Sequence, residues 1–225
     1  MSKNFFEIDN VTFAIGGMNK VTDANIHIKN EGEIICILGP SGIGKTTILR
    51  TIAGLEKINK GQIILKDKII SSDKTHLEPE KRNIALSFQE NSLFPHYTVD
   101  KNIHLGLKKN SIKDKSIDSN EIIKILNISN ILNKYPHQIS AGEAQRASLA
   151  RSLISQPDLL LLDEPLSNVD QSFKEDIQVA LKQILKKSKI STIVVTHDSY
   201  EAFYLGDKCA LILDGEVKQF DDPYN

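Results

Sequence analysis

The sequence has no tryptophan, two cysteines and two methionines, and it contains no apolar run of about 18 residues. We therefore expect no membrane-spanning segment, and Glu7 stands where a signal peptide would be apolar. Cys36 and Cys209 lie far apart in apolar runs, without metal-ligand spacing. They predict two buried thiols, and they exclude a disulfide framework.

Neither positive nor negative charge is in excess. The 28 basic and 29 acidic residues give a net charge of −1, so no overall field favours nucleic acid or an anionic membrane. We expect no nucleic-acid partner. With 40% hydrophobic residues over 225 positions, the composition is typical of a globular protein of one or two domains.

One stretch of nine residues fits the phosphate-binding pattern G-x-x-x-x-G-K-[ST]. It consists of Gly39, Pro40, Ser41, Gly42, Ile43, Gly44, Lys45, Thr46 and Thr47. The apolar run 33–38 before it predicts a buried strand, and 46–53 after it predicts a helix closed by Gly54. This context favours a true P-loop over an ordinary glycine turn.

The chemistry of a P-loop requires these residue types. Glycines let backbone N–H groups converge on phosphate oxygens, and the helix N-terminus adds partial positive charge. We expect Lys45 to meet the β- and γ-phosphates and the Thr46 hydroxyl to ligate Mg²⁺. The expected cofactors are therefore a nucleoside triphosphate and Mg²⁺.

The hydrophobic pattern predicts an α/β fold: a P-loop NTPase (RecA-like) core with a small antiparallel β-subdomain and a helical insertion. Alternation over 5–30 predicts antiparallel strands, and buried strands alternate with helices after residue 157. Helical patterns dominate in between. We expect one domain, 1–225, in which 1–90 and 156–225 form the core and 91–155 a helical subdomain. Residues 71–81 are expected to form a loop, and 108–119 an exposed linker.

Asp163 and Glu164 follow a run of four leucines, at the strand edge where open α/β sheets bind ligands. An Asp there can hold Mg²⁺, and the adjacent Glu can polarise an attacking water as a general base. An acidic turn alone would be unremarkable, but an acidic pair after a P-loop in one chain predicts hydrolysis.

Together these motifs resemble the nucleotide-binding subunit of ABC transporters. Residues 139–146, Ile-Ser-Ala-Gly-Glu-Ala-Gln-Arg, are similar to the family signature. Gln89 falls at the family's Q-loop, 167–170 matches its D-loop with Asp170, and His197 matches its switch histidine. The resemblance covers nearly the whole chain, in the family's order.

The resemblance implies that the nucleotide is ATP, and it implies roles for these residues. Ser140, Ala141, Gly142 and Glu143 would cap the γ-phosphate bound to a second subunit, so the catalytic unit would be a homodimer or a pair of ABC subunits. His197 would contact the γ-phosphate, although a lone histidine after a strand is more often structural. Gln89 would ligate Mg²⁺ and sense a membrane permease. The chain would lie at the cytoplasmic face of the inner membrane, peripheral through permease subunits and served indirectly by a solute-binding protein.

Three positions depart from the family pattern. Ala141 and Glu143 replace Gly and Gln in the signature, and Glu143 brings negative charge near phosphate. Ile15 stands where the family usually stacks an aromatic ring on adenine, and it offers only apolar contact there. The selectivity for the base and the affinity of the trans contact are therefore open.

Residues 88–99 are similar to the importer branch that serves iron(III), sulfate, polyamine, sugar and thiamine systems. The segments 79–84 and 135–137 look most like iron(III) importers, while 102–107 also resembles thiamine importers; polyamine and sulfate importers are further alternatives. Leu93, Phe94 and Tyr97 predict either an apolar surface for a permease helix or local packing. Three other classes of protein fit these motifs less well. A soluble ABC ATPase would usually fuse two cores or insert coiled coils. A P-loop kinase would not need the signature, and a non-hydrolysing subunit would not need Glu164.

Overall fold

The computed structural model describes residues 4–15, 17–87, 93–105, 118–167, 169 and 171–224, without the side chains of 15, 19 and 171–173. Gln89 and Asp170 therefore lie outside the described residues, as does the predicted linker apart from Asp118 and Ser119, which begin α3. Across the described ranges, no helix has the length and apolarity that a bilayer crossing requires.

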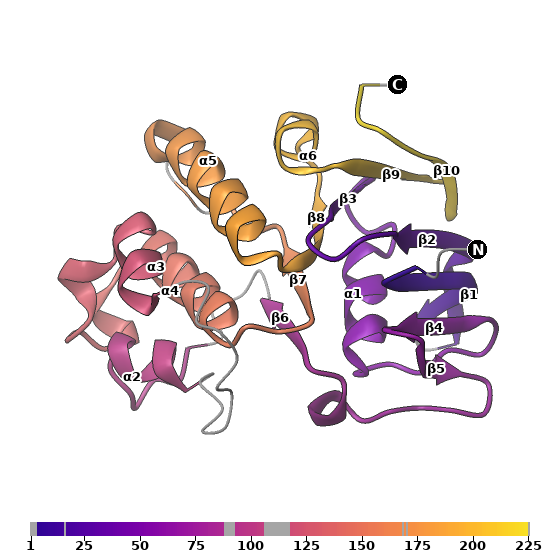
Figure 1. The fold of residues 1–225 in the computed structure, drawn as a ribbon, viewed down its shortest axis with the longest axis horizontal. Coiled ribbons are helices and arrows are strands. Elements are labelled where there is room, and N and C mark those ends of the chain that lie inside the picture. The colour runs from indigo at the N-terminus through magenta and orange to yellow at the C-terminus, as the bar shows by residue number, and fades with distance from the viewer. Residues whose placement is uncertain are drawn as a thin grey trace.

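The strands form two sheets (Figure 1). The antiparallel sheet has the order β2-β1-β4-β5, formed by Met18–Ile28, Phe6–Ile15, Gln62–Leu65 and Lys68–Ser72. The larger sheet has the order β10-β9-β3-β8-β7-β6, formed by Glu216–Asp221, Lys208–Leu213, Ile34–Leu38, Ser191–Thr196, Leu159–Asp163 and Ile84–Ser87. Its pairs are parallel except for the edge hairpin β9–β10. The α/β fold expected from the alternation of strands and helices is confirmed.

The helices are α1 Lys45–Ala53, α2 Val99–His104, α3 Ser119–Ile125, α4 Ala141–Ile154, α5 Gln171–Ser188 and α6 Ser199–Leu205. Short 3-10 turns cover Pro79–Lys81, Ser129–Ile131 and Pro136–Gln138. In Figure 1, α1 lies between the two sheets, and α2, α3 and α4 gather on the other side of the large sheet. Ser140 caps α4 and Asp198 caps α6, so side-chain oxygens fix where these helices begin.

The alternation of β7 divides the core in two. Leu160 and Leu162 belong to the hydrophobic cluster that contains helices α2 to α6. Leu159 and Leu161 belong to the cluster that contains α1 and the antiparallel sheet, and all four leucines are fully buried. A strand covered on both faces has no solvent side, which explains its uniformly apolar sequence.

The expectation of a loop from residue 71 was partly wrong. β5 continues to Ser72, pairs with β4, and Ser71 also bridges to His76. Ser71 is fully buried, and its hydroxyl accepts a hydrogen bond from Arg82 Nη2 at 2.9 Å, which compensates for the loss of water. Arg82 also donates to the carbonyls of Thr51 and Ile52 at the end of α1, and burial lowers its pKa to about 10.

The two cysteines are free and buried, as predicted. They are register partners on the neighbouring strands β3 and β9. Hydrogen bonding to Cys209, together with burial, raises the pKa of the Cys36 thiol well above its ordinary value. Cys36 is therefore an inert core residue.

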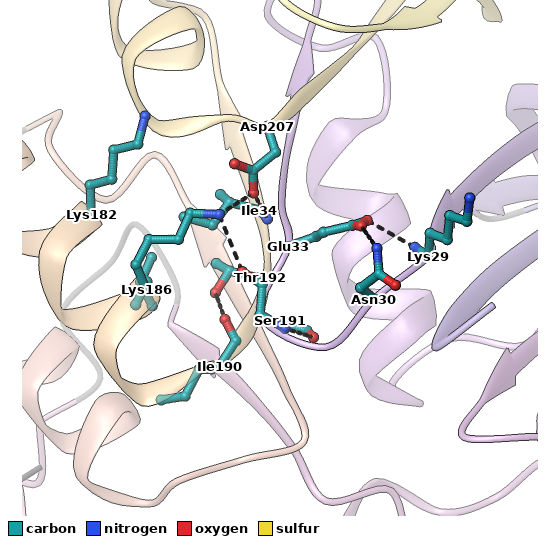
Figure 2. Close-up of polar contacts among 12 residues, drawn as sticks. Lys29, Asn30, Glu33, Ile34, Lys182, Lys186, Ile190, Ser191, Thr192 and Asp207 are labelled. Atoms are coloured by element: carbon teal, nitrogen blue, oxygen red, sulfur yellow. Dashed lines mark hydrogen bonds and ion pairs between the residues drawn. The ribbon is translucent and has the colours of Figure 1, made fainter. Parts of the chain in front are cut away.

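A polar clamp at the N-terminal edge of the large sheet joins α5, β3, β8 and the turn before β9 (Figure 2). Asp207 Oδ2 accepts hydrogen bonds from Ile34 N, at 2.7 Å, and from the Lys186 ammonium. The Ser191 hydroxyl accepts one from Gly32 N at 3.0 Å. The clamp ties down the start of β3, the strand whose other end carries the P-loop.

Candidate functional site

The P-loop joins β3 to α1 with the backbone that its glycines require. Gly42 and Gly44 have φ values of 80° and 115°, a region that favours glycine. Gly44 is the N-cap of α1 and provides no side-chain acceptor for the N–H groups of the first turn. These N–H groups and the helix dipole are thus available to an anion.

Close contacts with neighbouring strands also require glycine at two positions of the loop. A Cβ added to Gly39 would lie 2.7 Å from Ile212 O, and one added to Gly44 would lie 2.7 Å from Lys20 Cβ. The loop is therefore wedged between β9 on one side and β2 on the other.

The Lys45 ammonium is held beside the loop. Its side chain donates to Gly39 O at 2.7 Å and to Pro40 O at 3.0 Å, and the residue is only 5% exposed. Burial lowers its pKa, an effect that Glu164 and Asp163 oppose. Lys45 thus brings a positive charge to the centre of the phosphate-binding loop.

Asp163 ends β7 next to the start of α1. It is 5% exposed, and burial raises the pKa of its carboxyl, while a hydrogen bond with the Thr46 side chain opposes the rise. A hydroxyl and a carboxylate side by side are the oxygen donors that Mg²⁺ prefers. The donor set therefore fits a magnesium ion.

Glu164 lies in an unusual backbone conformation, with φ of 47°. Four hydrogen bonds of its backbone hold it. Its N–H donates to Val195 O at 2.9 Å, and its carbonyl accepts from Gln145 Nε2 at 2.9 Å, from the Ser167 hydroxyl at 3.0 Å and from Ser167 N at 3.2 Å. A non-glycine residue held at positive φ beside a ligand pocket points to a functional constraint.

His197 completes this side of the site. Its Nδ1 lies 3.1 Å from Glu164 Oε1, and its side chain is 58% exposed while that of Glu164 is 15% exposed. The ring follows β8, where Thr196 donates to Glu201 Oε2 and the N–H of Asp198 donates to the Thr196 hydroxyl. Two anchored neighbours therefore fix its position.

These residues share a single pocket of about 380 Å³. It is lined by Lys20, Ser41, Gly42, Gly44, Lys45, Thr46, Thr47, Asp163, Glu164 and His197. The sequence predicted every one of these residues except Lys20. No local pattern indicates that this residue, on a strand of the other sheet, lies against a loop about 20 residues later. Lys174 was also missed: it pairs with Asp198 at 2.6 Å beside His197.

Ser140, Ala141, Gly142 and Glu143 do not line this pocket. They open α4, where a reciprocal capping box forms: Glu143 N donates to Ser140 Oγ at 3.2 Å, and Ser140 N donates to Glu143 Oε2 at 2.8 Å. The backbone of Ile15 pairs with Met18 at the tip of the β1–β2 hairpin, and its side chain lies outside the description. Phe13 is fully buried in the core.

A P-loop opening a helix between two sheets, with an acidic pair and a histidine at the edge of a parallel sheet, defines a P-loop NTPase. The family model described as ABC transporter matches residues 21–167. This chain belongs to the ABC transporter family.

Relatives of this chain are named for different transported solutes. The chain is 38% identical to an Fe(3+) ions import ATP-binding protein of Fusobacterium nucleatum, over 99% of this chain and 59% of that protein. It is 39% identical to a maltose/maltodextrin import ATP-binding protein of Mannheimia succiniciproducens, over 95% and 57%. It is 41% identical to a spermidine/putrescine import ATP-binding protein of Nitrosospira multiformis, over 96% and 59%. The chain thus spans about three fifths of the length of these relatives.

Solved structures agree with the fold. A dimeric ATP-binding cassette in a post-hydrolysis state with ADP and phosphate superposes with a TM-score of 0.81 at 27% identity, covering 97% of this chain and 98% of that one. CbiO1 of Clostridium perfringens, part of an ABC transporter complex, gives a TM-score of 0.81 at 25% identity, covering 98% and 89%.

Proposed function

We propose that this chain is the ATP-hydrolysing subunit of an import-type ABC transporter. One observation carries the proposal: the P-loop, the Thr46–Asp163 pair and the Glu164–His197 pair open into one pocket. A phosphate-binding loop, an oxygen donor set and a held carboxylate are what phosphoanhydride hydrolysis requires.

Each group has a distinct task in this proposal. The P-loop amides and Lys45 bind the phosphates, and Thr46 and Asp163 hold magnesium, with Gln89 as a further proposed ligand. A magnesium ion there would neutralise charge on the phosphates. Glu164 accepts a proton from the attacking water, and His197, with Nδ1 turned to Glu164, presents its other ring nitrogen to the γ-phosphate.

We also propose that the working unit is a dimer. Ser140 lies outside the pocket of its own chain, at the start of α4, where its oxygen accepts a hydrogen bond from Glu143 N and its side chain is also hydrogen-bonded to the Glu143 carboxylate. The helix start can then donate to a phosphate held by a second copy, with Asp170 between the two copies. The dimeric relative with ADP and phosphate supports this arrangement.

The proposed membrane partner is a pair of permease subunits at the cytoplasmic face of the inner membrane, served by a solute-binding protein. Phe94 is 47% exposed and its ring packs edge-on with those of His96 and Tyr97. Leu93, by contrast, is 8% exposed and belongs to the core. The proposed docking surface is therefore aromatic, and residues 91–155 are the subdomain that would carry it.

Iron(III) is the proposed cargo, supported by the iron importer among the relatives and by segments 79–84 and 135–137. Maltose and polyamine importers match at similar identity, and thiamine and sulfate systems are further alternatives. Uptake assays with the permease genes that neighbour this one, using labelled iron(III), spermidine and maltose, would separate them. Uptake of a labelled solute other than iron(III) would contradict the proposed cargo.

The function itself is tested with the purified chain. We expect Mg²⁺-dependent hydrolysis of ATP, and we expect Glu164→Gln to lose at least a hundredfold in kcat while it still binds ATP, on the order of what a general base contributes. Lys45→Ala is the control that removes binding. A chain without affinity for adenine nucleotides, or a Glu164→Gln variant with unchanged kcat, would overturn the proposal.

A further inference from the structure

Lys20 is a cation of the nucleotide pocket that comes from the opposite sheet. It lies on β2 of the antiparallel sheet, whereas Asp163, Glu164 and His197 end strands of the parallel sheet, and all four line the same pocket. Lys20 thus forms part of the wall that faces the hydrolytic residues across the P-loop.

The backbone around Lys20 is fixed on both sides. Its Cβ lies so close to Gly44 that no side chain fits at position 44. Thr22 N donates to Gly215 O at 2.8 Å, in the turn between β9 and β10. A Cβ on Gly215 would come within 3.0 Å of Lys20 O. The lysine is therefore held at the mouth of the P-loop by two glycines.

The ammonium has no carboxylate partner among the described residues. Other lysines of this chain do: Lys60 pairs with Asp23 at 2.5 Å and Lys174 with Asp198 at 2.6 Å. The pocket's own acids, Asp163 and Glu164, are associated with Thr46 and His197. A half-buried lysine on the wall of a phosphate-binding pocket, without a protein anion, suits a phosphate oxygen.

The register of the hairpin indicates which part of a bound nucleotide would lie nearest to Lys20. Ile15 pairs with Met18 at the hairpin tip, where we expect the adenine, and Lys20 lies two residues beyond Met18 toward Gly44. Lys45 and Thr46 lie toward Asp163, where the β- and γ-phosphates are expected. Lys20 therefore stands between the base and the terminal phosphates.

We propose that Lys20 binds the α-phosphate of the nucleotide and is a determinant of affinity for ATP and ADP alike. This inference rests on the proposed function. Because both nucleotides carry the α-phosphate, the contact strengthens binding of substrate and product equally. It therefore affects the KM for ATP and the Kd for ADP together.

The test compares Lys20→Met with Lys20→Arg, and with Lys68→Met, an exposed lysine on β5 outside the pocket. Titration calorimetry with ATP and ADP should give a Kd about tenfold higher for Lys20→Met in both cases, the effect of one charge-assisted hydrogen bond. Lys20→Arg should retain most of the affinity, and Lys68→Met should match the parent chain. The salt dependence of Kd should also be weaker in Lys20→Met.

Diastereomers of ADP with sulfur on the α-phosphate locate the contact. Measured without magnesium, the preference of the parent chain for one diastereomer should shrink in Lys20→Met. An unchanged Kd, an unchanged preference, or a loss confined to ATP would overturn the assignment to the α-phosphate. A parent chain that binds neither nucleotide would instead overturn the proposed function, and this inference with it.

Discussion

At the scale of single residues, the departure at Glu143 has an explanation in the capping box. The carboxylate turns back to accept from Ser140 N, and this hydrogen bond lowers the pKa of Glu143. A Gln at this position can make the same bond through its carbonyl oxygen. The family's amide and this chain's carboxylate therefore serve the same cap, and they differ in charge.

Glu143→Gln is expected to strengthen ATP-dependent association of two copies by a few-fold, because it removes a negative charge near the phosphate proposed to lie against α4. The measurement is the ATP concentration that half-saturates dimer formation in a Glu164→Gln background, read by light scattering. Thermal stability serves as a control and should change little. Weaker association after the substitution would argue against a phosphate at this helix start.

Asp198 gives a prediction about pH. Its pKa is lowered chiefly by the hydrogen bond from Lys174, and its Oδ1 accepts from Tyr200 N and Glu201 N at the start of α6. A carboxyl whose pKa is lower in the folded state stabilises the fold above its unfolded pKa. That stabilisation is lost as the pH falls through the folded value.

Asp198→Asn keeps the cap and removes the charge. We expect it to lower the free energy of unfolding at pH 7 by about 0.5 kcal/mol, a small value because the pair is partly screened by solvent. The difference between parent and variant should vanish as the pH falls below the usual range of an aspartate. Urea unfolding from pH 7 down to pH 3 measures it, and a constant difference would contradict the linkage.

At the scale of elements, the polar clamp tests how the start of β3 is held (Figure 2). Asp207→Ala removes the acceptor of Ile34 N and the partner of Lys186. A partly buried N–H without an acceptor costs about 1–3 kcal/mol, and we expect that loss in the free energy of unfolding. Glu175→Ala, an exposed change on α5, is the control. A loss no larger than that of the control would mean that solvent satisfies Ile34 N.

Elements were predictable where local pattern decides them. The four leucines of β7 predict a strand buried on both faces, because such a strand has a continuous apolar run. Gly54 predicts the end of α1, because glycine favours the left-handed conformation of a C-cap. The end of β5 was expected to be loop because residues 71–81 are polar, whereas the burial of Ser71 depends on Arg82, 11 residues later. The pocket residues named by motifs were found together, while Lys20 depends on a contact between two sheets.

At the scale of the whole molecule, the proposed site is split between copies. Lys45 lies in the pocket, whereas Ser140 opens a helix outside it. Because a two-fold dimer presents the same surface of both copies to each other, each pocket would be completed by the partner's α4. A single chain then holds all the parts of a site without being able to assemble one.

Mixing variants tests this division. A Lys45→Ala dimer and a Ser140→Ala dimer each have two defective pockets, but a mixed dimer has one intact pocket and one that carries both changes. Mixing the two inactive preparations should therefore restore roughly a quarter of the parent ATPase activity, since half of the dimers are mixed and each has one working site. Ser140→Ala mixed with a Lys45→Ala, Ser140→Ala double variant forms no intact pocket and should stay inactive. If the first mixture also stays inactive although mixed dimers are detected, Lys45 and Ser140 do not act on one nucleotide from opposite copies.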